Sequence, residues 1–223
     1  MSTDTPTSPD AGPDPASAWL AAARADVARD PDTITRAFAL AARRVGRGPV
    51  HPASDPAGVV HGTVDDAARA ALVVALADAV GTGPDCADRL TTLYHQGDGA
   101  ERRGVLRGLD ALTERGDVGD LVPAGLDLAA DALRANDPSL VAAAVGPFGS
   151  RHLDQHTWRH AVLKLVFQGV SLAAVHDLDA RADAELDRMA RDFAAERRAA
   201  GRTVPADLDL LTGTSIRTGT TKD

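Results

Sequence analysis

Apolar residues recur with a helical period along almost the whole chain, and no segment alternates apolar and polar residues as a half-buried strand would. This spacing predicts helices over 19–27, 34–45, 63–80, 100–115, 122–133, 140–145, 155–167 and 178–200, with a shorter one through Leu90 and Leu93. We therefore predict an all-α fold, either a multi-helix bundle or an irregular stack of helix pairs, with a HEAT-like superhelix as a variant. Residues 84–115 and 120–146 share no fixed repeat period, which disfavours the superhelix.

The helix predicted over 155–167 is apolar on two sides. Trp158, Val162 and Leu165 form one apolar stripe at about 100° per residue. The opposite side carries Leu163, Phe167, His156, His160 and Lys164. A helix that is apolar on two sides is usually buried on both, so this second face is expected to line a pocket or to pack against a neighbouring helix. Asp154 is predicted to cap this helix and Gly169 to end it.

The candidate ligand-binding residues lie on this second face or are expected near it. They are His156, His160, Lys164, Phe167, Asp183, Tyr94 and Arg103. Lys164 can pair with Asp183 or Glu185, bind an anionic ligand, or interact with the dipole of its own helix. No residue is assigned a catalytic role, because no phosphate-binding glycine loop and no nucleophile-elbow motif occurs.

Three histidines spaced by four residues raise the question of a zinc site. His152, His156 and His160 would share one face of a continuous helix. However, His152 precedes the predicted cap at Asp154, and no HExxH motif is present. We therefore prefer pocket histidines to ligands, and we expect no metal and no cofactor.

A loop over 46–62 is rich in glycine and proline and is long for a compact domain. It is either an insertion or a functional lid. Its two histidines, His51 and His61, could be ligands, but we expect them to be exposed loop residues.

The helix predicted over 100–115 has an apolar stripe and a polar side. Val105, Leu109 and Leu112 are expected inside, and the polar residues Arg103, Arg107, Asp110 and Glu114 are expected to face out. The pairs Arg102-Arg103 and Arg197-Arg198 are expected on a salt-bridged surface, and Asp65-Asp66 in the first turn of a helix.

Two glycines one turn apart, Gly104 and Gly108, lie within the same helix. Each glycine costs about 1 kcal/mol relative to alanine in a helix interior, so the pair favours a close helix–helix approach.

Composition narrows the class of partner. A formal charge of −8 and 3% aromatic residues argue against nucleic acids and anionic membrane surfaces. Cys86 is the single cysteine, so no intramolecular disulfide and no thiolate metal cluster can form. No leader and no apolar run of about 18 residues is seen, so we expect a cytoplasmic protein without membrane insertion. Residues 16–211 are expected to form one domain between disordered tails, 1–15 and 212–223.

Four ordered motifs within 90–211 resemble the EboA-domain family. They are Tyr94-His95 with Gly97-Asp98 and Glu101-Arg102-Arg103; Trp158-Arg159 with Val162-Leu163-Lys164, Phe167 and Gly169; Arg181-Ala182-Asp183 with Glu185-Leu186 and Arg188-Met189; and Glu196-Arg197-Arg198-Ala199-Ala200-Gly201-Arg202 with Val204-Pro205. The resemblance implies a role in metabolite traffic, beside a prenyltransferase and TIM-barrel-type proteins whose gene clusters move secondary-metabolite precursors toward the cell envelope. It carries over no catalytic residues.

These observations favour a non-enzymatic accessory protein of secondary-metabolite precursor traffic or biosynthesis. It would bind a small metabolite, proteins of the same gene cluster, or both. One alternative is an enzyme acting on an anionic or prenylated intermediate through His156, His160 and Lys164. The other is a structural scaffold without a ligand.

Overall fold

The computed structural model describes residues 14–212, and the regular elements in this range are helices. The α-helices are α1 Pro15–Arg29, α2 Ile34–Val45, α3 Val64–Val80, α4 Pro84–Gln96, α5 Gly99–Arg115, α6 Val122–Arg134, α7 Pro138–Ala143, α8 Pro147–His152, α9 Gln155–Gln168, α10 Leu178–Arg181, α11 Ala184–Ala199 and α12 Leu208–Thr212. Short 3-10 helices occupy η1 Pro31–Thr33, η2 Gly119–Leu121 and η3 Leu172–Ala174. The all-α prediction is confirmed. The predicted disordered tails lie outside the described residues, except at their inner ends, because α1 begins at Pro15 and α12 ends at Thr212.

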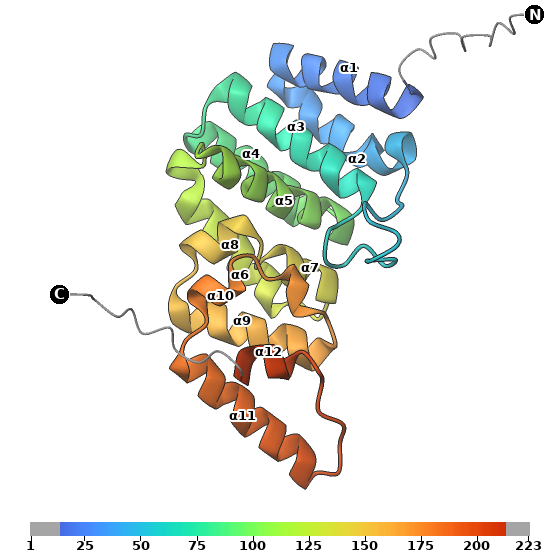
Figure 1. The fold of residues 1–223 in the computed structure, drawn as a ribbon. Helices are drawn as coiled ribbons and strands as arrows, with labels where there is room; N and C mark the ends of the chain where they lie inside the picture. The colour runs from blue at the N-terminus through green and yellow to red at the C-terminus, as the bar shows by residue number, and fades with distance from the viewer. Residues whose placement is uncertain (1–13, 213–223) are drawn as a thin grey trace, which may run out of the picture.

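The helices form an irregular stack that follows the chain from α1 and α2 at one end to α11 at the other (Figure 1). Helices α3 and α5 lie side by side in the N-terminal half and pack against each other more extensively than any other described pair. Helix α3 also contacts α1 and α2, and α5 contacts α4, α7 and α8. The organising contact of the fold is therefore between α3 and α5.

The close approach of α3 and α5 depends on the two glycines of α5. A Cβ atom on Gly104 would lie 2.5 Å from Cβ of Arg69, and one on Gly108 would collide with the side chain of Val73. The prediction that this pair permits close helix–helix packing is confirmed.

Several helix ends follow their local sequence signals. Thr63 and Asp66 form a capping box at the start of α3. Asp154 caps α9 through the N–H of Thr157, and Gly169 ends that helix in the left-handed region with φ 70°. The predictions for Asp154 and Gly169 are confirmed, because the cap and the stop depend only on residues close in sequence.

Two predicted boundaries are wrong. The predicted gap between the helices over 140–145 and 155–167 contains a further helix, α8, with Pro147 at its first position. The long helix predicted from Leu178 is divided into α10 and α11, because the Asp183 side chain accepts the N–H of Leu186 and starts a new helix.

The second face of α9 lies largely at the surface, contrary to the predicted burial on both sides. His156 and His160 are exposed, with their ring centroids 4.4 Å apart, and Phe167 is 60% exposed. Leu163 on the same side is buried. Water solvates these imidazoles, which would be costly to bury without partners. None of the described helices is long and apolar enough to cross a lipid bilayer.

Candidate functional site

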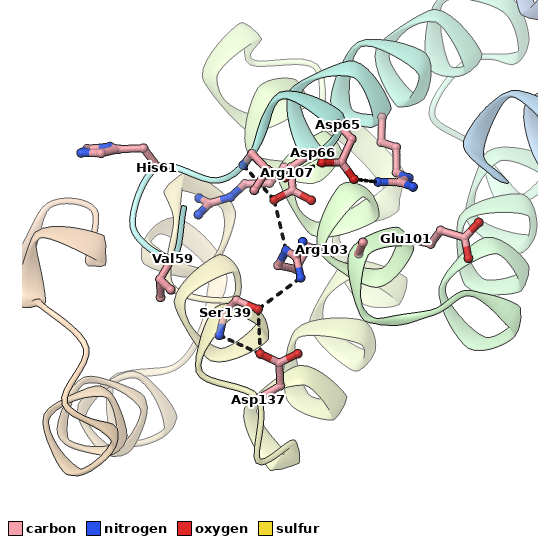
Figure 2. A network of polar contacts seen from close by, with 12 residues as sticks. Val59, His61, Asp65, Asp66, Glu101, Arg103, Arg107, Asp137 and Ser139 are labelled. Atoms are coloured by element: carbon pink, nitrogen blue, oxygen red, sulfur yellow. Dashed lines mark hydrogen bonds and ion pairs between the residues drawn. The ribbon is translucent and has the colours of Figure 1, made fainter. Parts of the chain in front are cut away.

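Three ion pairs connect acidic and basic side chains at and around the α3–α5 interface. Figure 2 shows the two that involve Asp65 and Asp66. Their oxygen–nitrogen distances are 2.6 Å for Asp65–Arg69, 3.1 Å for Asp66–Arg103 and 3.4 Å for Asp110–Arg107. The three aspartates are almost completely buried. Buried charges require such partners, so these residues are structurally constrained.

From the part of the chain that the structure describes, the Asp66 carboxylate accepts two hydrogen bonds through one oxygen and none through the other. Its Oδ2 atom accepts the backbone N–H of Thr63 and the Nε–H of Arg103, each at 3.1 Å. Its Oδ1 atom is buried without a hydrogen-bond partner among the described residues. Unpaired buried polar atoms are rare in folded proteins, so this oxygen marks a place where an additional donor would be favourable.

Arg103 extends the network to α7. Its guanidinium group donates to Oγ of Ser139 at 3.2 Å, and that hydroxyl donates to Asp137 at 2.6 Å (Figure 2). The predicted salt-bridged surface is therefore wrong for Arg103, whose partner is the buried Asp66. The guanidinium group of the neighbouring residue, Arg102, lies over the ring of Tyr94.

Arg107 connects α5 to the loop over 46–62. One terminal nitrogen donates to the carbonyl oxygen of Val60 at 2.9 Å, and the other reaches Asp110 at 3.4 Å. Its Nε atom is buried and has no partner among the described residues. This nitrogen can donate to an additional acceptor.

Asp110 is buried against the start of α8. Its carboxylate accepts the N–H of Phe148 at 2.9 Å, and a Cβ atom on Gly146 would collide with it. Burial raises the pKa of Asp110 to about 6, against the opposing effects of Arg107 and of the Phe148 N–H. The predicted outward orientation of Arg107 and Asp110 is wrong, because the loop and α8 cover this side of α5.

The loop over 46–62 is organised by one buried carboxylate. Asp55 accepts the backbone N–H groups of Val59, Val60 and His61 at 2.8 to 3.0 Å. Burial acts to raise the pKa of Asp55, but these three donors bring it below the ordinary value. His51 and His61 are exposed, as predicted, with ring centroids 4.7 Å apart.

A surface cavity of about 250 Å³ lies where this loop, α3, α5 and α8 meet. Its lining consists mainly of polar residues with a few small apolar ones: His61, Asp66, Ala67, Arg107, Asp110, Ala111, Glu114 and Pro147. A second cavity of about 220 Å³ shares Glu114 and Pro147 with it and extends to His176 and Arg181. We name the first of these the α3/α5/α8 cavity. It brings three carboxyl groups and one guanidinium group to one place.

The predicted ligand-binding residues are not gathered around this cavity. Arg103 is connected to it through its pair with Asp66. Lys164 donates to the carbonyl oxygens of Leu133 and Ala135 at 2.6 and 2.8 Å, where it compensates the C-terminal end of α6.

The other predicted residues also have partners of their own. The buried hydroxyl of Tyr94 donates to Asp131 at 3.0 Å, and burial raises the pKa of this hydroxyl. Asp183 pairs with Arg159, whose hydrogen bond lowers the pKa of the carboxyl group to about 2. The ring of Phe167 lies against that of Phe193 with centroids 4.1 Å apart.

The polar residues of α5 at and beside the cavity are marked by a pattern in the sequence. Arg103, Arg107 and Asp110 recur at helical spacing, directly beside Gly104 and Gly108. If another helix approaches closely at the two glycines, their polar neighbours are also covered and need partners.

Within residues 14–212, no group of three His, Cys, Asp or Glu side chains could hold a metal ion.

Comparison with known proteins matches the chain to a family. The family described as "Metabolite traffic protein EboA" matches residues 15–212, which include all the helices described above. No curated protein and no solved structure matches the chain. Because the match covers most of the sequence, this chain belongs to the EboA family.

Proposed function

We propose that this chain is a non-catalytic accessory protein of metabolite traffic, and that it binds a small polar metabolite in the α3/α5/α8 cavity. The observation that carries the proposal is the pair of buried atoms without partners beside this cavity, Asp66 Oδ1 and Arg107 Nε. Both belong to residues that line it. The family name supplies the setting of metabolite traffic.

The dimensions of the cavity favour a small ligand. Its volume of about 250 Å³ lies just below the usual range of ligand pockets, about 300 to 1,000 Å³. The neighbouring cavity that shares Glu114 and Pro147 leaves room for part of a longer molecule. A pocket built from a few converging polar groups on helices supports specific recognition.

The test is a variant that fills the cavity without changing its polar network. Ala111 lines the cavity from α5 and is half-buried, so Ala111→Leu adds apolar volume there. Ala79→Leu, on the exposed side of α3, is the matched control. In cells that carry the gene cluster, we expect Ala111→Leu to reduce delivery of the metabolite to the envelope and Ala79→Leu to leave it unchanged. Normal delivery by a folded Ala111→Leu protein would refute the proposal.

A second candidate function is catalysis at the same cavity. Burial raises the pKa of Asp110 to about 6, which is suitable for a general acid or base at neutral pH. Asp110→Asn keeps an oxygen for the Phe148 N–H but removes the proton-transferring group. An enzyme would lose turnover in this variant while still binding its substrate, whereas an accessory protein would keep metabolite delivery.

The ligand-binding role of His156, His160, Lys164, Phe167, Asp183, Tyr94 and Arg103 stays a prediction, as do the cytoplasmic location and the partners from the same gene cluster. Replacing His156, His160 and Lys164 by alanine tests the alternative on α9. Loss of metabolite delivery by a folded triple variant, with normal delivery by Ala111→Leu, would move the site to that helix.

A further inference from the structure

The α3/α5/α8 cavity offers both a donor and an acceptor to a ligand. Arg107 Nε can only donate, and Asp66 Oδ1 can only accept. Asp110 and Glu114 add two more carboxyl groups to the lining. A complementary molecule must therefore donate several hydrogen bonds and accept at least one.

An anionic ligand does not fit this set of groups. A carboxylate or phosphodiester group only accepts hydrogen bonds at neutral pH, and here it would face three carboxyl groups. Arg103 pairs with Asp66 and Arg107 with Asp110, so these charges balance one another, and the carboxyl group of Glu114 leaves the lining with a net negative charge.

An ammonium ligand satisfies the hydrogen-bond acceptors of the cavity but not its donor. It would donate to the carboxylates, but it has no acceptor for Arg107 Nε and would place a second positive charge beside that guanidinium group. A prenyl chain would leave all the unpaired polar atoms buried, at a cost of about 1 to 3 kcal/mol each. The only small apolar residues in the lining are Ala67, Ala111 and Pro147.

Hydroxyl groups meet both requirements, since each one donates and accepts. We propose that the α3/α5/α8 cavity binds a neutral, polyhydroxylated metabolite, with one hydroxyl group between Asp66 Oδ1 and Arg107 Nε. This inference rests on the proposed function. It excludes the anionic and prenylated intermediates considered from the sequence as ligands of this cavity.

The loop over 46–62 lies beside the two side chains that carry the unpaired atoms. Both atoms are covered in the structure, and a Cβ atom on Gly62 would lie 3.3 Å from Asp66 Oδ2 and 3.7 Å from Arg107 Nε. The Val60 carbonyl, two residues before Gly62, accepts the hydrogen bond from Arg107. Binding therefore requires the Val60–Gly62 segment to move away from Arg107, which would release this hydrogen bond as the ligand enters.

The experiment follows the Nε–H resonance of Arg107 by nitrogen–proton NMR, with Arg107→Lys to assign it. The probes, at equal millimolar concentrations, are myo-inositol, inorganic phosphate, putrescine and propionamide. We expect myo-inositol to shift this resonance most, and Ala111→Leu to weaken the response by at least about tenfold, or 1.4 kcal/mol. Ala79→Leu should respond like the wild type.

Three results would overturn the inference. The first is a stronger response to phosphate, putrescine or propionamide than to myo-inositol. The second is no response to myo-inositol together with a contact between the Nε–H and bound water, which would mean that water alone fills the site. The third is an equal response to myo-inositol in the Ala111→Leu protein. If Ala111→Leu abolishes delivery in cells but the ligand proves to be anionic or cationic, the proposed function survives and only the polyol inference fails.

Discussion

Arg103 on α5 donates its Nε–H to Oδ2 of Asp66, 3.1 Å away at the start of α3. The same carboxylate oxygen accepts the N–H of Thr63, so one atom caps α3 and ties it to α5. Because Asp66 also lines the α3/α5/α8 cavity, the capping of a helix and the shape of the candidate site depend on a single carboxylate.

Removing the partner of this carboxylate is therefore expected to be costly. Arg103→Met leaves a buried charge unpaired, which typically costs about 3 kcal/mol or more. The control is Arg29→Met. The wild-type ion pair of Arg29 with Asp26 is exposed, so its loss is expected to reduce the free energy of unfolding by less than about 1 kcal/mol. Urea denaturation measures both. Equal losses would contradict the structural role assigned to the Asp66–Arg103 pair.

The glycines of α5 give a second prediction. In Gly108→Ala the new methyl group meets Val73, so we expect a loss of about 1 to 3 kcal/mol in the free energy of unfolding despite the better helix propensity of alanine. Val73→Ala makes room for the methyl group. The double variant should therefore lose less than the sum of the two single variants.

The control for this pair is Gly48→Ala, because a Cβ atom at Gly48 has no neighbour within 4 Å. Its stability should stay within about 0.5 kcal/mol of the wild type. Additive losses at positions 73 and 108 would show that α3 and α5 do not pack as described.

The loop over 46–62 should depend on Asp55. Asp55→Ala removes the acceptor of three backbone N–H groups, and hydrogen exchange should accelerate at Val59, Val60 and His61. Amides in the middle of α9 serve as the internal control. Unchanged exchange at the three loop amides would mean that other contacts hold the loop closed.

The raised pKa of Asp110 predicts an unusual pH dependence of the protein's stability. Its pKa is about 6 in the folded protein and 3.8 ordinarily, so the folded state binds the proton more tightly than the unfolded state. Relative to Asp110→Asn, the wild type should gain stability as the pH falls from about 6 to about 4, by at most about 3 kcal/mol. Urea denaturation at several pH values measures this difference.

Asp183 should change the protein's stability with pH in the opposite direction. The hydrogen bond from Arg159 lowers the pKa of Asp183 to about 2, so its contribution is present above about pH 4 and is lost as the pH falls toward 2. Relative to Asp183→Asn, the wild type should lose stability over that interval. If both aspartates gave the same sign, the burial assigned to Asp110 would be wrong.

Local sequence signals predicted the helices but not their covered faces. The cap at Asp154 and the stop at Gly169 depend on neighbouring residues, and they were predicted correctly. The outward orientation of Arg107 and Asp110 was wrong because amphipathic patterns assume that charges face water. Here the charges pair with one another and with Val60 and Phe148, residues distant in the sequence.

For the helix over 155–167 the prediction was wrong in the opposite direction, because it expected burial where side chains are exposed. Its two-sided pattern predicted burial of His156, His160 and Phe167, yet these residues are exposed. Periodicity records which residues could be buried but not whether another element covers them. Gly104 and Gly108 were the stronger signal, because their cost in a helix interior is offset only by a close neighbour.

The most direct test is to purify the protein from the cells in which it occurs naturally and to identify the co-purifying small molecules by mass spectrometry. Wild type, Ala111→Leu and the Ala79→Leu control are compared at equal protein concentration. We expect a neutral, polyhydroxylated molecule with the wild type and the control, and its loss from Ala111→Leu. The same molecule in equal amount on all three proteins would contradict the assignment of the α3/α5/α8 cavity as the metabolite site.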